Sequence, residues 1–438
     1  MDHYKWLRNS PLFPTEISRL SIDSPCLHSR DPRRRARSAE NEITTGRISI
    51  FDPGSTDRLL PTNKIILHVN QSWFADGTLP SGRSRSARDE LTMSTKLKID
   101  PPLLNSASPW ATTLEQIKAL YDSPYTGAVT IRTSLLEGFT HNDAHHQYIF
   151  FTASKAVPAN PTLGDASASA LSSNNCTLNT LGYSPLTLSE YLGIINEIVG
   201  QRHLGTDTPT KKPFILSVTG TADEIEMAYA LIANAAEMDE DLRLAMEVNL
   251  SCPNIAGKPP PAYDAARLAE YLEAVSDSKS TYRGRMATPD SVPKVGIKMP
   301  PYTYSGQFEM VVNSLKNAKS TEPGEGSVID FITCTNTLGS SLVLDENGNP
   351  ALSSEAGTGI GGLAGAALHP LALGNVATFR KLLDLHPETK DVMIIGVGGV
   401  EDKAGFDRMK KVGAVAVACA SALGRYGVPI FEKITKGE

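Results

Sequence analysis

The sequence has few cysteines and no long apolar run. Its 438 residues include five cysteines, which are scattered without a Cys-x-x-Cys pair. A small, odd number of scattered cysteines favours reduced thiols in the cytosol over a disulfide framework or a zinc site. No apolar run approaches the ~20 residues of a membrane-spanning helix, and the N-terminus lacks the apolar core of a secretory signal peptide. We therefore expect a cytoplasmic protein with no membrane partner.

An excess of basic charge is also absent. The formal net charge is −6 at pH 7, so no general positive field favours nucleic acid or an anionic membrane. Hydrophobic residues make up 40% of the chain and charged residues 21%, which is ordinary for a globular protein. We expect small molecules as partners and no nucleic acid.

The first ninety or so residues lack hydrophobic periodicity. RDPRRRAR (Arg30–Arg37) and SGRSRSARDE (Ser81–Glu90) are polar and rich in Arg and Ser, which is typical of disorder. A mitochondrial transit peptide would be poor in acidic residues, and this segment is not. We predict a disordered or poorly structured extension over residues 1–92, of open role, and a folded domain over residues 93–438. Met93 is a candidate natural start of translation.

Short apolar runs then alternate with amphipathic segments of helical spacing, such as Thr113–Asp122, Ala222–Glu237 and Tyr263–Asp277. Strands that alternate with helices predict a parallel sheet with right-handed crossovers. Eight such runs favour a closed (β/α)8 TIM barrel over an open doubly wound sheet, which stays the alternative. The eight predicted strands are Leu103–Ala107, Gly127–Arg132, Phe214–Val218, Leu244–Leu250, Val295–Met299, Val328–Cys334, Val392–Val397 and Val415–Ala420.

The connection after the second predicted strand is too long for a simple turn. It runs from Glu137 to Leu186 and predicts an excursion or lid over the strand ends. It contains His141, His145 and His146, whose spacing matches no standard ligand pattern, so we expect no metal site. The segment Ala144–Asp165 within it is an insertion of open role.

The chemistry of such a barrel lies at the C-terminal ends of its strands. The residues there are rich in amides and hydroxyls and contain two cations, Arg132 and Lys298, one thiol, Cys252, and no His/Asp pair. This set suits a planar ligand with carbonyl, N–H and anionic groups better than a hydrolytic triad or a metal centre. Trp73 and Trp110 are better explained as packing residues than as a stacking platform for bases.

Three glycine-rich stretches and one lysine point to a phosphorylated cofactor. VMIIGVGGV (Val392–Val400) and AVACASALGRYG (Ala416–Gly427) follow the last two predicted strands, where such barrels bind phosphate, and Gly357–Leu368 supplies a third stretch. Each glycine-rich stretch, taken alone, is explained by turns that need glycine for positive φ. Two roles are open for Lys298. It is a strand-end lysine whose ammonium reaches solvent, or it is a fixed positive charge beside a cofactor that becomes anionic, such as a reduced flavin.

Five motifs together resemble the class 1 (cytosolic, fumarate-type) dihydroorotate dehydrogenases. They are EVNLSCPNIAGKP, GIKMPPY, TNTLGSSL, GGLAGAALHPLALGNV and IIGVGGVED, and the resemblance runs from about Pro102 to the C-terminus. It implies an FMN-binding (β/α)8 barrel, usually a homodimer, that oxidises (S)-dihydroorotate to orotate in de novo pyrimidine (UMP) biosynthesis. It also implies fumarate as the electron acceptor.

The resemblance assigns residues as well. It implies that Cys252 is the catalytic base, since this family carries a cysteine in the NLSCPN loop. The implied substrate-binding residues are Arg132, Asn179, Gly182, Asn249, Asn254, Asn336 and Thr337. The implied cofactor-binding residues are Ser106, Arg132, Asn249, Lys298, Gly361, Gly362, Gly398, Gly399, Ala420 and Ser421.

Three positions depart from the family pattern. Arg132 stands where the family has lysine, Asn179–Tyr183 (NTLGY) replaces an Asn-Ser-Met-Gly loop, and Ala420-Ser421 replaces Gly-Thr. Arginine keeps the charge but has a larger, forked head. A diverged FMN barrel that acts on another pyrimidine-like substrate, or a flavin-binding protein without enzymatic activity, therefore stays open as an alternative.

Overall fold

The computed structural model describes residues 96–154, 157–158, 174–202, 212–239, 242–251, 260–286, 291–318 and 326–437. The predicted extension over residues 1–92 lies outside these ranges. So do two of the predicted site residues, Cys252 and Asn254.

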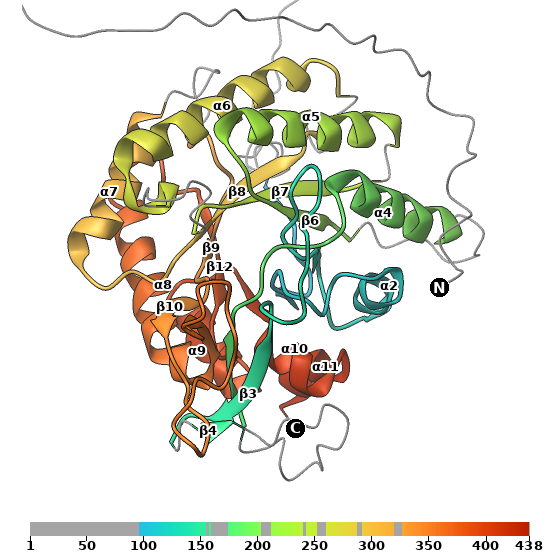
Figure 1. Cartoon of the computed structure of the whole chain (residues 1–438). Helices are drawn as coiled ribbons and strands as arrows, with labels where there is room; N and C mark the ends of the chain where they lie inside the picture. Colours follow the sequence, from blue (N-terminus) through green and yellow to red (C-terminus); the bar gives the residue numbers. More distant parts are fainter. Residues whose placement is uncertain are drawn as a thin grey trace, which may run out of the picture. The chain divides into compact units, whose positions relative to one another are not determined.

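Eight parallel strands form a barrel in the order β1-β13-β12-β9-β8-β7-β6-β2 (Figure 1). A parallel bridge between Leu104 and Ala128 joins β1 to β2, the two ends of that order. The strands are β1 (Leu103–Asn105), β2 (Val129–Thr130), β6 (Phe214–Val218), β7 (Leu244–Asn249), β8 (Lys294–Met299), β9 (Phe331–Cys334), β12 (Met393–Val397) and β13 (Ala416–Cys419). The predicted (β/α)8 barrel is confirmed. Seven of the predicted strand runs contain one of these strands, and the eighth, Val295–Met299, lies within β8, which begins one residue earlier.

Helices follow the strands and cover the outside of the barrel (Figure 1). Thr221 begins α5 with a capping box, since its side chain accepts from the backbone of Glu224 and the Glu224 carboxylate accepts from the backbone of Thr221. The helices are α2 (Leu114–Asp122), α4 (Leu188–Arg202), α5 (Ala222–Met238), α6 (Ala265–Arg283), α7 (Ser305–Asn317), α8 (His369–Leu383), α9 (Lys403–Lys411), α10 (Ser421–Tyr426) and α11 (Pro429–Lys436). In the described part of the chain, none of them combines the length and apolar character needed to cross a membrane.

A small apolar cluster fills one layer of the barrel interior. Leu104, Ile215, Ala245 and Phe331 belong to it and are buried completely or almost completely. Gly296 makes room for the largest of them, because a Cβ at Gly296 would lie 2.2 Å from the ring of Phe331. Alternation along each strand then directs the residues two positions later into the next layer of the interior, towards the C-terminal strand ends.

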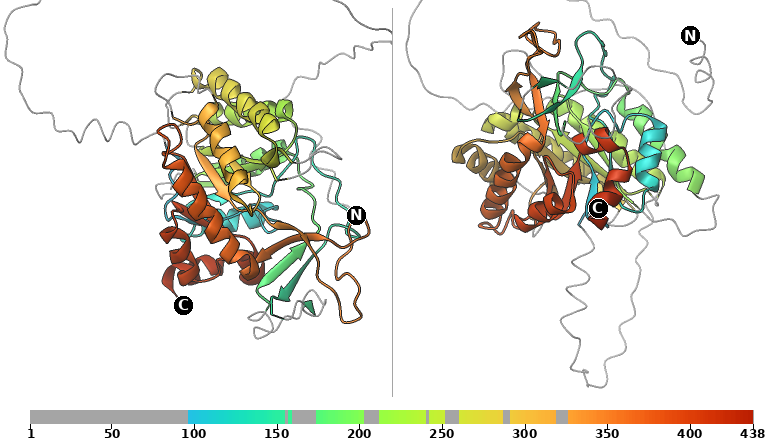
Figure 2. Two further views of the ribbon diagram at one scale, coloured as in Figure 1. Left: turned by 90° about the vertical axis from the view of Figure 1, so that its left-hand side faces the viewer. Right: turned by 90° about the horizontal axis from the view of Figure 1, so that it is seen from below.

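The long excursion after β2 does not form a lid by itself. Its strands join the segment after β9 in a five-stranded sheet of order β10-β11-β5-β3-β4, which projects from the barrel (Figure 2). Gly361 and Gly362 lie in β11 of this sheet, where a Cβ at Gly361 would lie 2.2 Å from the carbonyl oxygen of Asn179. The strands are β3 (Tyr148–Thr152), β4 (Val157–Pro158), β5 (Cys176–Asn179), β10 (Leu338–Ser341) and β11 (Gly361–Gly365).

Candidate functional site

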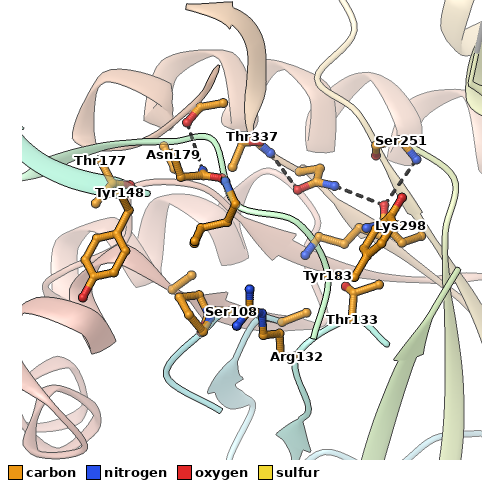
Figure 3. A pocket seen from close by; sticks show the side chains of 18 of the residues that line it. Ser108, Arg132, Thr133, Tyr148, Thr177, Asn179, Tyr183, Ser251, Lys298 and Thr337 are labelled. Carbon is orange, nitrogen blue, oxygen red and sulfur yellow. Dashed lines mark hydrogen bonds between the residues drawn. The ribbon is translucent and has the colours of Figure 1, made fainter. Parts of the chain in front are cut away.

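A cavity of about 400 Å³ opens at the C-terminal ends of the barrel strands, between the barrel and the second sheet. Its size falls within the range of pockets for small molecules and cofactors. Arg132 and Lys298 both enter it, and Tyr148 and Asn179 line it from the second sheet (Figure 3). The sheet that the sequence predicted only as an excursion therefore supplies one wall of the site.

Lys298 is a buried cation at the exit of β8. Only 4% of the residue is exposed, and its Nζ donates a hydrogen bond to Ser106 Oγ at 3.1 Å. Burial lowers the pKa of this ammonium, while the charge of Glu247 acts in the opposite direction. A snorkelling lysine would be exposed, so the structure favours the alternative of a fixed charge facing the cavity.

Arg132 enters the cavity from the exit of β2. Its Nη2 donates to the carbonyl oxygen of Gly182 at 3.1 Å, which ties the loop after β5 to the barrel. Burial lowers the pKa of the guanidinium, with an opposing effect from Tyr191, but arginine remains protonated because its ordinary pKa is so high. Gly182 itself lies against the ring of Phe139, where a Cβ would approach to 2.1 Å.

Three asparagine amides and a threonine form part of the polar lining. Asn336 Nδ2 donates to Asn249 Oδ1 at 3.1 Å, and the backbone N–H of Ser251 donates to the same oxygen at 3.2 Å. Asn179 is held from both ends, because its Nδ2 donates to the Gly362 carbonyl and its Oδ1 accepts from the backbone of Leu181. Within the described residues Asn249 Nδ2 and Thr337 Oγ1 have no hydrogen-bond partner, so both are available to a ligand.

Aromatic residues form a wall that the sequence analysis did not assign to the site. Trp110 and Tyr148 line the cavity, and the Trp110 ring packs edge-on against Tyr148 at 5.5 Å and stacks on Phe150 at 5.9 Å between centroids. The expectation that Trp110 is a packing residue is therefore incomplete, since it packs and lines the cavity at once. Trp73 lies outside the described residues. No local motif marks these residues, because the second sheet brings them together.

The glycine turn after β12 has a backbone that only glycine adopts easily. Gly398 and Gly399 have φ of 138° and 66°. His369 fixes the turn: its Nε2 accepts from Arg408 Nε at 3.0 Å, so its Nδ1 carries the proton donated to the Gly398 carbonyl at 2.7 Å. Gly399 borders a second, smaller cavity together with Ala420 and Ser421, which also line the main one.

Most of the predicted site residues gather at the main cavity. Four described ones do not line it: Ser106, Gly361, Gly398 and Gly399. Ser106 lies behind Lys298 as its hydrogen-bond acceptor. The predicted residues that line the main cavity are Arg132, Asn179, Gly182, Asn249, Lys298, Asn336, Thr337, Gly362, Ala420 and Ser421. Ser251, which precedes Cys252 in the chain, lines it too.

Comparison with known proteins shows the family of this chain. The family model described as dihydroorotate dehydrogenase matches residues 139–437. The chain belongs to this family. It is 30% identical over 283 residues to the dihydroorotate dehydrogenase (fumarate) of Trypanosoma cruzi, covering 61% of this chain and 80% of that protein. It is 28% identical over 284 residues to the Trypanosoma brucei brucei protein of that name, covering 62% and 81%.

A bacterial relative gives the same family. The chain is 29% identical over 263 residues to the putative dihydroorotate dehydrogenase A (fumarate) of Streptococcus pyogenes, covering 59% of this chain and 71% of that protein. The resemblance stated from the five sequence motifs is confirmed, as is the prediction of an oxidoreductase of the dihydroorotate dehydrogenase family. The family match begins at residue 139 and so includes the second sheet as well as most of the barrel.

Proposed function

We propose that this chain binds FMN and oxidises (S)-dihydroorotate to orotate in de novo pyrimidine biosynthesis, with fumarate as the electron acceptor. The observation that carries the proposal is the buried Lys298 at a cavity whose other walls present amides, hydroxyls and Arg132. Fumarate is supported by the names of the relatives. We extend the proposal to residues 93–438 as the catalytic domain and to a homodimer in the cytoplasm, on the family resemblance.

The residues present fit FMN. The glycine turn at Gly398 and Gly399 and the adjacent Ser421 offer backbone N–H groups and a hydroxyl for a phosphate, and Lys298 offers a positive charge for the ring. Bound FMN would supply the acceptor for the hydride that leaves C6 of the substrate. Arg132, Asn249 and Lys298 would hold the ring system.

The substrate has a carboxylate and a ring with carbonyl and N–H groups, which matches the rest of the lining. Arg132 offers the N–H groups that Gly182 does not use, and these suit a carboxylate. Asn179, Asn249 and Asn336 offer amides that are fixed by their own hydrogen bonds, so little ordering is required when the ring binds. Asn254 completes the proposed set by resemblance.

Cys252 is the proposed base for the proton at C5 of the substrate. An unperturbed thiol has a pKa of about 8.5, within reach of the working pH. The described cysteines are poor alternatives, because Cys176, Cys334 and Cys419 are buried and burial raises the pKa of each thiol. A positioned base typically contributes about 10²- to 10⁴-fold in rate.

The test is spectroscopic. The purified protein should show the blue absorbance of bound flavin, and dihydroorotate should bleach it without oxygen present. The variant Cys252→Ala should keep the flavin but bleach about 10²- to 10⁴-fold more slowly. Cys176→Ala, a buried thiol on β5 away from the proposed chemistry, is the matched control and should bleach at the original rate. Undiminished bleaching by Cys252→Ala would show that the base is another group.

The same experiment separates the alternatives. Flavin absorbance without any bleaching by dihydroorotate would favour another pyrimidine-like substrate or a flavin-binding protein without this activity. Reoxidation of the bleached protein with fumarate, a quinone and NAD, each supplied separately, tests the acceptor. A protein reoxidised faster by quinone or NAD than by fumarate would refute that part of the proposal.

A further inference from the structure

A carboxylate lies inside the barrel directly below the cavity. Glu247 on β7 is only 2% exposed, and both of its oxygens accept hydrogen bonds from hydroxyls. Ser217 on β6 donates to Oε1 at 3.0 Å, and Thr333 on β9 donates to Oε2 at 2.5 Å. Thr133 in turn bonds to Ser217 at 2.9 Å. Hydroxyls from β6 and β9, on either side of β7 in the sheet, thus hold this one side chain in place.

The hydroxyls satisfy the oxygens of Glu247 but do not balance its charge. Within the described residues no cation lies within 4.0 Å of the carboxylate. A buried carboxylate without a balancing cation costs several kcal/mol or changes its protonation state. A positive charge elsewhere in the barrel interior would offset this cost.

Lys298 is the cation that the strand register brings to Glu247. Asn249 and Lys298 are paired across β7 and β8, and Lys298 and Thr333 are paired across β8 and β9. Glu247 lies two residues before Asn249, so its side chain points into the same interior, and its carboxylate binds the Thr333 hydroxyl next to Lys298. Thr333 thus connects the two residues. Its hydroxyl donates to the Glu247 carboxylate, and its backbone is paired with Lys298 across β8 and β9.

The other titratable groups at this end of the barrel do not compete. Arg132 lies after β2, on the far side of β6 from β7, and is bonded to Gly182. Cys334 and Cys419, at the ends of β9 and β13, belong to the larger apolar cluster between barrel and helices, and burial raises the pKa of both thiols. They are neutral at ordinary pH.

We propose that Glu247 is a positioning residue that keeps Lys298 in its ammonium form beneath the cavity. In the described structure Glu247 is the carboxylate whose charge acts on Lys298, and the one hydrogen bond of Lys298 goes to the neutral hydroxyl of Ser106. Burial alone favours the neutral amine, and the negative charge of Glu247 opposes that effect. The charge pairing concerns the apoprotein, and its consequence for the flavin rests on the proposed function.

The first test measures the titration of Lys298 in flavin-free protein. Lysine labelled with ¹³C at Cε reports protonation by NMR, and Lys298→Met identifies the signal. In Glu247→Gln, which keeps the size of the side chain, the midpoint should fall by about 1 to 3 pH units, the typical effect of a nearby charge. Ser217→Ala is the matched control: it removes a hydrogen bond but keeps the charge, and should shift the midpoint less. An unchanged midpoint in Glu247→Gln would overturn the proposal.

The second test uses thermal unfolding and stays decisive if Glu247→Gln folds poorly. The loss of Tm caused by Glu247→Gln should be smaller in the Lys298→Met background, because the uncompensated ammonium is then absent. If the single variant does not fold, a folded double variant supports the pairing. Equal losses in both backgrounds, or a double variant that fails while Lys298→Met folds, overturn it.

Binding of FMN at a series of pH values then separates this inference from the proposed function. For the original protein, the dissociation constant of FMN should not change with pH over the range in which Lys298 remains protonated. In Glu247→Gln it should rise with pH, following the lowered midpoint. If FMN fails to bind the original protein, the proposed function fails while the NMR result still stands.

Discussion

Replacement of Arg132 by leucine should weaken the binding of orotate. The guanidinium is nearly buried, at 9% exposure of the residue, and one N–H is fixed by the Gly182 carbonyl. Its other N–H groups face a cavity in which Lys298 is the second described cation. A hydrogen bond to a charged group contributes about 1.5–3 kcal/mol. The loss of one such bond to the carboxylate of orotate corresponds to a roughly 10- to 150-fold higher Kd.

The assay is a titration of the flavin-loaded protein with orotate, followed by the change in flavin absorbance. Arg285→Leu is the matched control, because Arg285 lies at the surface, paired with Glu237, and does not line the cavity. Its Kd for orotate should stay unchanged. An Arg132→Leu variant whose Kd rises less than 3-fold while it retains FMN would show that Arg132 does not hold the carboxylate. Because the lost cation is always charged, the effect should not vary between pH 6 and 9.

Three glycine substitutions give further predictions. Gly296→Ala should lower the free energy of unfolding by about 1–3 kcal/mol in urea titrations, because its methyl would lie 2.2 Å from the Phe331 ring. Gly193→Ala, in the middle of α4 with no atom within 4 Å of the new methyl, should raise it by about 0.5–1 kcal/mol. Gly362→Ala should raise the Kd for orotate about tenfold or more, because its methyl would lie 2.3 Å from Thr337 Oγ1. A result of opposite sign in any of the three would contradict the local geometry.

The barrel was predictable from the sequence because its signals are local. Each strand is a short apolar run, and helix starts such as Thr221 with Glu224 carry their own capping residues. The second sheet was not predictable. Its strands β5 and β11 pair across a gap from Asn179 to Gly361, and the glycine-rich composition of β11 resembles that of a turn. Only the close approach of the two backbones explains those glycines.

The site was predictable where a strand end supplies the side chain. Arg132, Asn249 and Lys298 follow apolar runs, and the parallel arrangement brings them to the same edge. The aromatic wall of Trp110 and Tyr148 was missed, because these residues reach the cavity from a loop and from a strand of the second sheet. The roles of Cys252 and of the other assigned residues stay predictions until the variants are measured.

The charged layer below the cavity shows what kind of information the sequence lacks. Alternation alone places Glu247, Lys298 and Thr333 inside the barrel, two residues after Ala245, Gly296 and Phe331. It does not say which of them lie level with one another. The register does: Glu247 pairs with Gly296, and Lys298 pairs with Thr333, so Lys298 stands one step above Glu247. This stagger is a property of a closed barrel. It places an anion beneath a cation instead of beside it, and so leaves the cation free to face the cavity.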